Sequence, residues 1–395
     1  MRERFLSFSP PDIGEEEIAE VVDTLRSDWI TTGPKVKRFE GDFATYVGAE
    51  AALALNSCTA ALHVALTVAG VGPGDIVVST PMTFSSSIHV IEHTGARPLL
   101  VDVEPDTLNI DPARVEAALV ESGKSAKAIL PVHLHGHPAD MHPILESARR
   151  HGVAIVEDAA HSLPARYRGR LVGTPDPAFP DVTDMVAYSF YATKNVTTGE
   201  GGMLTAAASD IERARMWALH GMSRDAHNRY GAGGSWRYDV EVAGFKYNMS
   251  DIQAALGIHQ LRRLESMQER RHQIVACYQE ALGPLDVIER PRARPDVDPA
   301  WHIYAIRLNL DRMKIGRAEF IERLAERNIG TSVHFIPVHL MSYYRGRYGY
   351  RPDDFPVANS QFERLVSLPL SPRMSDEDVA DVIQAVTEVA SAALR

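Results

Sequence analysis

The chain has 395 residues, of which 45% are hydrophobic and 24% are charged, and its net charge is −11 at pH 7. These values are ordinary for a soluble globular protein and leave room for two lobes. The acidic charge argues against a surface that binds nucleic acid or anionic membranes in general. Only two cysteines occur, Cys58 and Cys277, which are too few for a disulfide framework and fit a reducing, cytoplasmic location.

The first half of the chain alternates between helical and strand-like patterns. Apolar residues recur at helical spacing over residues 12–27 and 36–46. Residues 51–71 are apolar but interrupted by polar side chains, so we expect a strand, a loop and a buried helix there and no membrane span. The next predicted elements are strands at 75–79, 97–103 and 128–132 and helices at 112–120 and 143–150. This alternation predicts a largely parallel sheet with helices on both faces.

The second half continues the pattern and then changes it. We expect strands at 185–190 and 202–206, a helix at 211–219, a surface loop at 221–243 and a long helix at 250–271. Beyond these lie predicted strands at 301–310 and 331–337 and helices at 317–327 and 376–394. The sequence therefore predicts a large domain at 1–255 and a smaller α+β domain at 256–395.

Lys194 is the strongest candidate for a catalytic residue. It lies between an apolar strand that ends at Phe190 and a glycine-rich turn at residues 199–202. A lysine amine is a nucleophile only after it loses its proton, and desolvation beside a buried strand favours that loss. The alternative is a solvated turn residue, because most lysines lie at the surface.

Two further stretches give Lys194 a chemical context. Asp158 follows the apolar run 153–156, and open α/β sheets bind ligands at the carboxyl ends of their strands. Small and hydroxyl residues open the predicted helix in residues 56–63, so its free N–H groups suit a phosphate. A lysine for an aldehyde, a carboxylate for a pyridine nitrogen and a phosphate cup together indicate pyridoxal 5′-phosphate (PLP). Taken alone, Asp158 could instead cap a helix or turn.

Five segments carry a resemblance to a known family. They are WITTGP at 29–34, NSCTAALH at 56–63, EDAAH at 157–161, TKN with TTGEGG within 193–202, and GFKYNM at 244–249. Together they resemble the DegT/DnrJ/EryC1/StrS sugar aminotransferases over nearly the whole chain. The resemblance implies a type I PLP-dependent transferase fold like that of aspartate aminotransferase, with a mainly parallel central sheet and a smaller C-terminal α+β domain.

The resemblance also implies roles around the cofactor. Lys194 would bind the cofactor aldehyde and act as acid and base, and Asp158 would form a charge-assisted hydrogen bond to the pyridinium. Hydroxyls of Thr59 and Ser189 would contact the phosphate. The backbone donors beside them come from Cys58, Thr59 and Ala60, and the family more often has glycine where Cys58 stands.

Other residues are expected around the ring and the substrate. Phe84 matches the aromatic residue that stacks on the cofactor ring, although an aromatic residue after a strand is more often part of the core. His161 and His334 would lie near the cofactor hydroxyl and the substrate, or could be structural. Asn248 would reach from the neighbouring subunit of a homodimer to close the phosphate cup.

The resemblance implies transfer of an amino group from L-glutamate to a keto carbon of a nucleotide-linked deoxysugar. The pattern at 244–253 is similar to that of the branch that aminates C4 rather than C3. The nucleotide, which could be TDP, UDP or GDP, the stereochemistry of the sugar and the pathway are left open.

Other classes of protein remain as alternatives. A sugar dehydratase of the same fold would replace the lysine with histidine, and a non-catalytic regulatory protein would keep only the fold. A cysteine desulfurase needs a mobile nucleophilic cysteine, for which Cys58 and Cys277 are poorly placed. Histidines at 133, 135, 137 and 142 suggest a metal site, with His133 and His135 on one strand face, but their spacing matches no known ligand signature, so we expect no metal.

Overall fold

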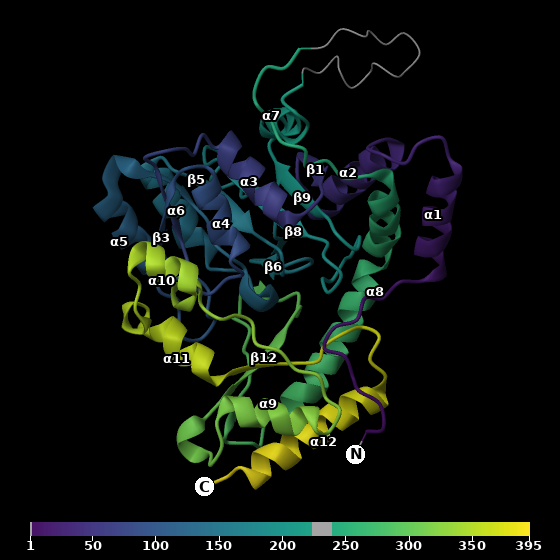
Figure 1. Cartoon of the computed structure of the whole chain (residues 1–395), viewed down its shortest axis with the longest axis vertical. Coiled ribbons are helices and arrows are strands. Elements are labelled where there is room, and N and C mark those ends of the chain that lie inside the picture. Colours follow the sequence, from purple (N-terminus) through teal and green to yellow (C-terminus); the bar gives the residue numbers. More distant parts are fainter. Residues whose placement is uncertain (1, 223–238) are drawn as a thin grey trace.

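The computed structural model describes residues 2–222 and 239–395. Its centre is a seven-stranded sheet in the order β1-β9-β8-β5-β4-β2-β3, in which β9 runs antiparallel to both of its neighbours (Figure 1). The strands are β1 (Ala51–Leu55), β2 (Ile76–Ser79), β3 (Arg97–Leu100), β4 (Ala126–Ile129), β5 (Ala154–Asp158), β8 (Asp184–Ser189) and β9 (Gly202–Ala206). The predicted mainly parallel sheet is confirmed.

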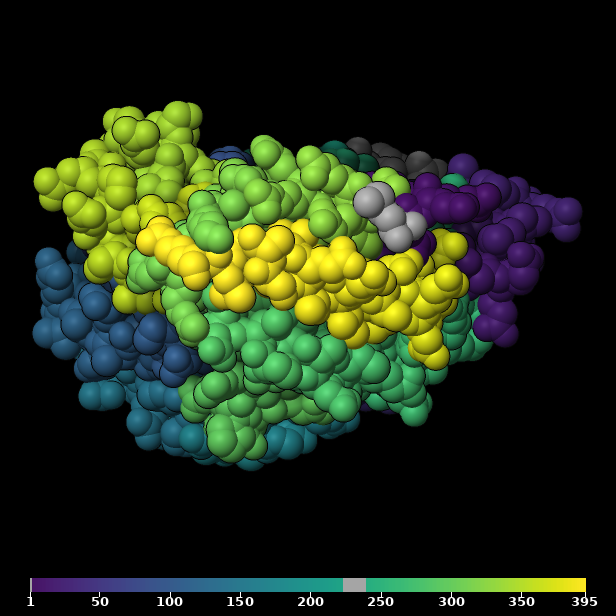
Figure 2. All heavy atoms as spheres, turned by 90° about the horizontal axis from the view of Figure 1, so that it is seen from below, coloured from purple at the N-terminus to yellow at the C-terminus, as the bar shows by residue number. Residues whose placement is uncertain are grey.

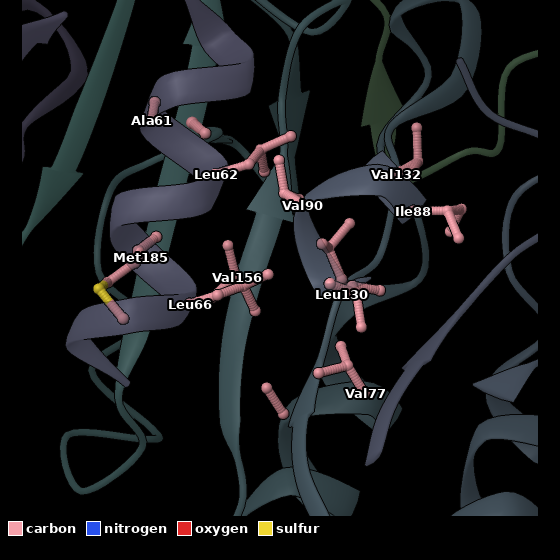
Figure 3. Close-up of a cluster of buried hydrophobic side chains, with 14 of the residues drawn as sticks. Ala61, Leu62, Leu66, Val77, Ile88, Val90, Leu130, Val132, Val156 and Met185 are labelled. Atoms are coloured by element: carbon pink, nitrogen blue, oxygen red, sulfur yellow. The ribbon is translucent and has the colours of Figure 1, made fainter. Parts of the chain in front are cut away.

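Helices cover both faces of this sheet, as the alternating pattern predicted. On one face α3, α4 and α7 pack on the strands, and on the other α2 and α8 lie beside α5 and α6. Figure 3 shows Leu66 of α3 beside Val156 of β5 and Leu62 beside Val90 of α4, in one buried cluster with Met185 of β8. Burying each of these leucines contributes about 1.5–3 kcal/mol. The helices are α1 (Glu15–Arg26), α2 (Pro34–Val47), α3 (Cys58–Val68), α4 (Ser86–His93), α5 (Pro112–Ser122), α6 (Met141–His151), α7 (Ala208–Ala218) and α8 (Asp251–Ala281).

A second core lies in the C-terminal third of the chain. A three-stranded sheet in the order β10-β12-β13 packs against α9, α12 and the end of α8. Figure 2 views this end of the molecule, where α12 lies across the surface. The elements are β10 (Ile288–Glu289), β12 (Tyr304–Leu308), β13 (Leu365–Leu368), α9 (Arg317–Ala325), α10 (Ser342–Tyr348), α11 (Pro356–Arg364) and α12 (Asp376–Ala392).

Short elements complete the fold. A small sheet joins β11 to β6 and β7. These strands are β6 (Arg166–Tyr167), β7 (Arg170–Leu171) and β11 (Val297–Asp298), and the 3-10 turns are η1 (Gly123–Ser125), η2 (Leu134–Gly136), η4 (Leu310–Arg312), η5 (Val338–Leu340) and η6 (Pro352–Asp354). No helix among residues 2–222 and 239–395 is both long and apolar enough to cross a membrane.

Several predicted elements differ from the structure. Residues 331–337 contain no strand, because only Ser332 pairs, in an isolated bridge with Ser367. Helix α4 was not predicted, and α8 continues ten residues beyond the expected end at 271. Most of the loop predicted at 221–243 lies outside the described residues. The predicted domain boundary at 255/256 falls inside α8, and the division stays a prediction.

Candidate active site

A cavity of about 500 Å³ opens where β5 and β8 end. Most of the predicted site residues line it, and they come from five separate parts of the chain. These lining residues are Cys58, Thr59, Phe84, Asp158, His161, Ser189, Lys194 and His334. Ala60 and Asn248 are not among the residues that line this cavity. The cavity therefore contains most of the predicted residues, whereas Ala60 lies outside it, and Asn248, which is expected to serve a neighbouring subunit, lies outside the cavity of its own chain.

Lys194 stands on a tight turn after β8. Its backbone N–H donates to the Tyr191 carbonyl oxygen at 2.9 Å, and the N–H of Thr198 donates to the Phe190 oxygen at 2.9 Å. The turn packs closely around Gly201, because an added Cβ would lie 2.2 Å from Thr198 Oγ1 and 2.8 Å from Met249 Cε. Burial lowers the pKa of Lys194 to about 8, against the opposing effect of Asp158. More of this amine is therefore unprotonated at neutral pH than of a surface lysine.

Asp158 is the last residue of β5, and its side chain is held by donors. The carboxylate accepts a hydrogen bond of 2.6 Å from Ser87 Oγ and one of 3.1 Å from the N–H of Ala160. The Ser87 hydroxyl also lies 2.7 Å from that of Thr83. The backbone N–H of Asp158 donates to the Pro131 oxygen at 2.9 Å. Strand pairing and side-chain donors thus fix one carboxylate in the cavity that holds Lys194.

The start of α3 forms another wall of the cavity. Ser57 caps the helix, and its Oγ accepts from the N–H of Ala60 at 3.1 Å. Because this bond occupies Ala60, the free donors of the first turn are those of Cys58 and Thr59, which have no intrahelical acceptor. Gly202 approaches this turn so closely that an added Cβ would lie 2.4 Å from the Ser57 carbonyl carbon. Such a helix start is suited to an anion.

Cys58 faces the sheet rather than the helix exterior. Its Sγ lies 3.7 Å from the Ala187 carbonyl oxygen and 4.0 Å from Asp158 Oδ1. Burial and the charge of Asp158 raise the pKa of the thiol well above its ordinary value. Because the thiolate is the nucleophile of cysteine chemistry, Cys58 is not suited to desulfuration.

Aromatic rings close the opposite side. Phe84 is 59% exposed and lies 5.9 Å, centroid to centroid, from Phe335. The ring of Phe8 stacks on His334 at 5.2 Å. His334 Nδ1 lies 2.9 Å from Ser367 Oγ, and burial together with His135 lowers its pKa to about 3. His334 is therefore a neutral imidazole at physiological pH.

Two buried histidines present different atoms toward the cavity. The backbone N–H of His135 donates to His161 Nδ1 at 3.2 Å, so a neutral His161 carries its proton on Nε2. Asn195 Nδ2 donates to the Leu163 and Ala300 oxygens, which directs Asn195 Oδ1 at His302 Nδ1. His302 therefore carries its proton on Nδ1 and keeps a lone pair on Nε2. Burial lowers the pKa of both imidazoles well below the ordinary value.

Sequence reasoning missed several residues of this cavity. One of them, Tyr191, lies in the lysine turn itself, whereas the others come from other parts of the chain. The missed lining residues with polar or aromatic side chains include Phe8, Thr83, Tyr191, His302 and Phe335. A signal was present for Phe335, which follows the predicted His334. None pointed to Phe8, which precedes the first helix.

The four histidines considered as metal ligands have separate partners. His133 Nε2 lies 2.5 Å from Glu157 Oε2, whereas His135 Nε2 lies 2.7 Å from the His334 carbonyl oxygen. The expectation that His133 and His135 share a strand face was wrong, because β4 ends at Ile129 and η2 carries His135. Among residues 2–222 and 239–395, no group of three or more ligand side chains could hold a metal ion.

Asn248 lies beside the start of α3 but outside the cavity. It forms an isolated antiparallel bridge with Leu55, and its Nδ2 donates to Thr32 Oγ1 at 2.6 Å. Lys246 Nζ donates to Asn248 Oδ1. The Asn248 amide is thus held next to the turn of residues 31–34, the TTGP turn.

The donor set fits PLP. An amine with a lowered pKa, a fixed carboxylate and a helix start with hydroxyl neighbours line one cavity, as in the chemistry that PLP requires. The close approach of Gly202 to Ser57 forms a cradle that any larger residue would fill. The structure therefore brings together the three features on which the cofactor prediction rested.

Comparisons with known proteins agree with this geometry. The model of the DegT/DnrJ/EryC1/StrS aminotransferase family matches residues 11–387. The spore coat polysaccharide biosynthesis protein SpsC of Bacillus subtilis is 48% identical over 394 residues, which cover 99% of each chain. Putative sugar aminotransferase Spr1654 from Streptococcus pneumoniae, in a PLP form, has a TM-score of 0.89 and 34% identity, with 99% of this chain and 100% of that chain covered.

A further solved structure, S. venezuelae DesV, has a TM-score of 0.85 and 35% identity, with 95% of this chain and 94% of that chain covered. Spr1654 has been solved in PLP and PMP forms, which agrees with the cofactor predicted from Lys194 and Asp158. The type I transferase fold predicted from the sequence is confirmed. Because the family model spans nearly the whole chain, this protein belongs to the DegT/DnrJ/EryC1/StrS aminotransferase family.

Proposed function

We propose that this protein is a PLP-dependent aminotransferase that moves an amino group from L-glutamate to the C4 keto carbon of a nucleotide-linked deoxysugar. The observation that carries the proposal is that Lys194 and Asp158 line one cavity, the amine with a lowered pKa and the carboxylate fixed by Ser87. The bound cofactor would supply an aldehyde that exchanges amines and a ring that accepts electrons from the substrate carbon.

Lys194 would hold the cofactor aldehyde and later move a proton at the substrate carbon. Its lowered pKa leaves the amine able to take up and release a proton near neutral pH. Asp158 would hold the ring nitrogen, which needs a carboxylate acceptor to stay protonated. The charge-assisted hydrogen bond would be aligned by Ser87 and Ala160.

The remaining lining residues would bind and orient. Thr59, Ser189 and the backbone N–H groups of Cys58 and Thr59 would contact the phosphate, and Phe84 would cover one face of the ring. His161 offers a donor on Nε2 for the cofactor hydroxyl, whereas His334 would lie against the substrate. Ala60 is left out of this set, because its N–H is bonded to Ser57.

The sugar substrate is supported by the relatives. SpsC is named for polysaccharide biosynthesis and Spr1654 as a putative sugar aminotransferase. Nucleotide linkage, C4 and glutamate come from the resemblance of residues 244–253 to one branch of the family. The dehydratase alternative is disfavoured by a lysine at 194, and the regulatory alternative by the cavity with its full set of chemical groups.

A substrate screen tests the function. Purified protein with PLP is mixed with glutamate and with TDP-, UDP- or GDP-linked 4-keto and 3-keto sugars, and mass spectrometry measures the aminated sugar while 2-oxoglutarate is assayed separately. We expect one 4-keto sugar to be aminated with an equal amount of 2-oxoglutarate. Amination of 3-keto sugars alone would overturn the C4 assignment, and deoxygenation without amination would favour the dehydratase.

We also propose a homodimer with shared sites. Asn248 lies outside its own cavity and donates a hydrogen bond to Thr32 in the turn that follows α1. This turn and α1 carry exposed apolar side chains, which include Ile18, Leu25 and Ile30. An exposed apolar surface of this kind is typical of an interface. A cytoplasmic location is supported by the two free cysteines.

A further inference from the structure

Three titratable side chains that the proposed reaction does not use lie behind Asp158, and two of them are buried. Glu157 precedes Asp158 on β5 and points to the opposite face of the sheet. His133 Nε2 lies 2.5 Å from Glu157 Oε2, and Asp184 at the start of β8 lies within hydrogen-bonding reach of Glu157. His133 and Glu157 are buried, and Asp184 borders a separate cavity of about 380 Å³ at the far end of the sheet.

The hydrogen bonds fix where the protons are. The N–H of Ala139 donates to His133 Nδ1 at 3.0 Å, so the neutral ring carries its proton on Nε2 and donates to Glu157. Asp184 Oδ1 is buried and has no donor among the described residues. Two carboxyl groups can satisfy each other only if one of them is protonated. Burial raises the pKa of Glu157 and that of Asp184, in agreement with one proton held between them.

This cluster is tied to the backbone of Asp158. The backbone N–H of His133 donates to the Asp158 carbonyl oxygen at 3.1 Å, while the His133 ring contacts the side chain of Glu157. Two adjacent residues of β5 are therefore joined to one residue, His133, through its main chain and its side chain. The loop after β4 and the end of β5 are held in one relative position.

We propose that Glu157 is a positioning residue for Asp158: through His133 and a proton shared with Asp184, it fixes the end of β5 so that Asp158 faces the ring of the cofactor. The inference rests on the proposed function, because it assigns Asp158 to the cofactor. Glu157 itself is not among the residues that line the cavity. Its effect passes through the backbone of the strand.

The test measures PLP binding to apoprotein by visible titration, together with the position of the absorbance band of the bound cofactor. We expect Glu157→Ala to weaken PLP binding at least about tenfold and to shift the band. Glu157→Gln should stay within about twofold of the natural protein, because its amide can accept from His133 and donate to Asp184. Rescue by glutamine distinguishes positioning from a need for charge.

Ile155→Ala is the matched control. Ile155 lies two residues earlier on the same face of β5, is fully buried and pairs in the sheet with Asp184, so its truncation lowers the melting temperature while the Glu157 and His133 side chains are both kept. We expect its PLP affinity and band to match those of the natural protein. Where Glu157→Ala does not fold, Glu157→Asp replaces it, since a shorter side chain breaks the contact to His133 and keeps the charge.

The outcomes separate the two proposals. If Glu157→Ala binds PLP as tightly as the natural protein does, the positioning role is overturned and the proposed function stands. The same loss in Ile155→Ala as in Glu157→Ala would also overturn it, because the effect would then follow general destabilisation. Failure of the natural protein to bind PLP would overturn both.

Discussion

The chemistry of single residues in this cavity depends on what surrounds each charge. Lys194 loses its proton more readily than a surface lysine because burial disfavours the ammonium. Asp158 keeps two donors, Ser87 Oγ and the N–H of Ala160, on its carboxylate. The carboxylate of Asp158 is therefore held in place by groups of other residues, which carry no charge themselves.

We expect Lys194→Ala to abolish transamination while the chain still folds, because the lost amine is a reacting group and only its stem packs. Borohydride reduction of the natural protein followed by peptide mass spectrometry should place the cofactor on Lys194. Lys314→Ala, at an exposed position on the other lobe, is the control and should keep both activity and label. A label on any other lysine would refute the assignment.

Replacement of Asp158 by Asn should preserve the shape of the side chain and remove its charge. Turnover should fall at least about a hundredfold, equivalent to about 2.7 kcal/mol in the barrier, with PLP still bound. Ser87→Ala removes one donor to the same carboxylate and should cost less. Steady-state rates under saturating PLP check this, and near-normal turnover of the Asn variant would make Asp158 a structural cap.

The residues that the sequence revealed are those within continuous motifs. Lys194, Asp158 and the start of α3 stood out because each follows an apolar strand or opens a helix. Ser87 and His302 did not, since their roles depend on contacts with Asp158 and Asn195, which are more than 70 residues away in the chain. Contacts of that separation leave no periodic pattern in a single sequence.

At the scale of elements, Gly202 at the start of β9 packs so closely on the start of α3 that no side chain fits at this position. We expect Gly202→Ala to destabilise the protein by about 2 kcal/mol or more and to weaken PLP binding, because the added Cβ would lie 2.4 Å from the Ser57 carbonyl carbon. Thermal unfolding and PLP titration measure both effects.

Gly41→Ala is the matched control for this glycine. Gly41 lies within α2, and nothing lies within 4 Å of an added Cβ. Alanine favours helix over glycine by about 1 kcal/mol, so this variant should be as stable as the natural protein or more so. A Gly202→Ala protein with unchanged stability and affinity would show that the junction can shift.

The Glu157 and Asp184 pair should make folding stability depend on pH. Burial raises the pKa of Glu157 from 4.5 to about 7, so the folded state binds a proton more tightly than the unfolded chain. This stabilisation is complete below the unfolded pKa and is lost as pH rises through about 7.

Asp184→Asn isolates this effect, because an amide donates to Glu157 without a shared proton. Other titratable groups near the pair are His133, Tyr188 and Asp176, and they are the same in both proteins. Urea unfolding of both apoproteins should show the natural protein losing stability relative to the variant between about pH 5 and pH 8. Parallel pH curves would contradict a shared proton.

Element predictions succeeded where hydrophobic periodicity was strong. The strands β1, β5, β8 and β9 were located to within a few residues because each is a short apolar run between turn residues. Residues 331–337 have a strand-like composition, but they cross to the cavity, where His334 contacts Ser367 and Phe8. Tertiary contacts at the site there override local propensity.

At the scale of the whole molecule, one helix links the two cores. Helix α8 begins at Asp251 beside the large sheet and ends at Ala281 in the C-terminal core, with a capping box between Ser250 and Gln253 at its start. Asp251 also accepts hydrogen bonds from the N–H groups of Gly33 and Val36. The TTGP turn, Asn248 and the start of α8 are therefore held as one surface.

That surface is where we expect a second copy of the chain. Asn248 is fixed by Thr32, and Leu25 of the neighbouring α1 is 58% exposed. The apolar side chains would be covered in a two-fold dimer, and the same contact would bring Asn248 to the partner's phosphate cup. The sequence could suggest this arrangement only through its family resemblance, because a single chain contains one half of the shared site.

Co-expression of two inactive variants tests the shared site. Lys194→Ala and a disabling change at Asn248 are each first shown to be inactive alone, and are then produced together. If Asn248 serves the partner's pocket, each mixed dimer has one pocket with both lesions and one with neither. Random assortment then restores about a quarter of the natural activity. If both residues serve the same pocket, every pocket keeps one lesion and no activity returns, which would refute the shared site and leave the aminotransferase assignment intact.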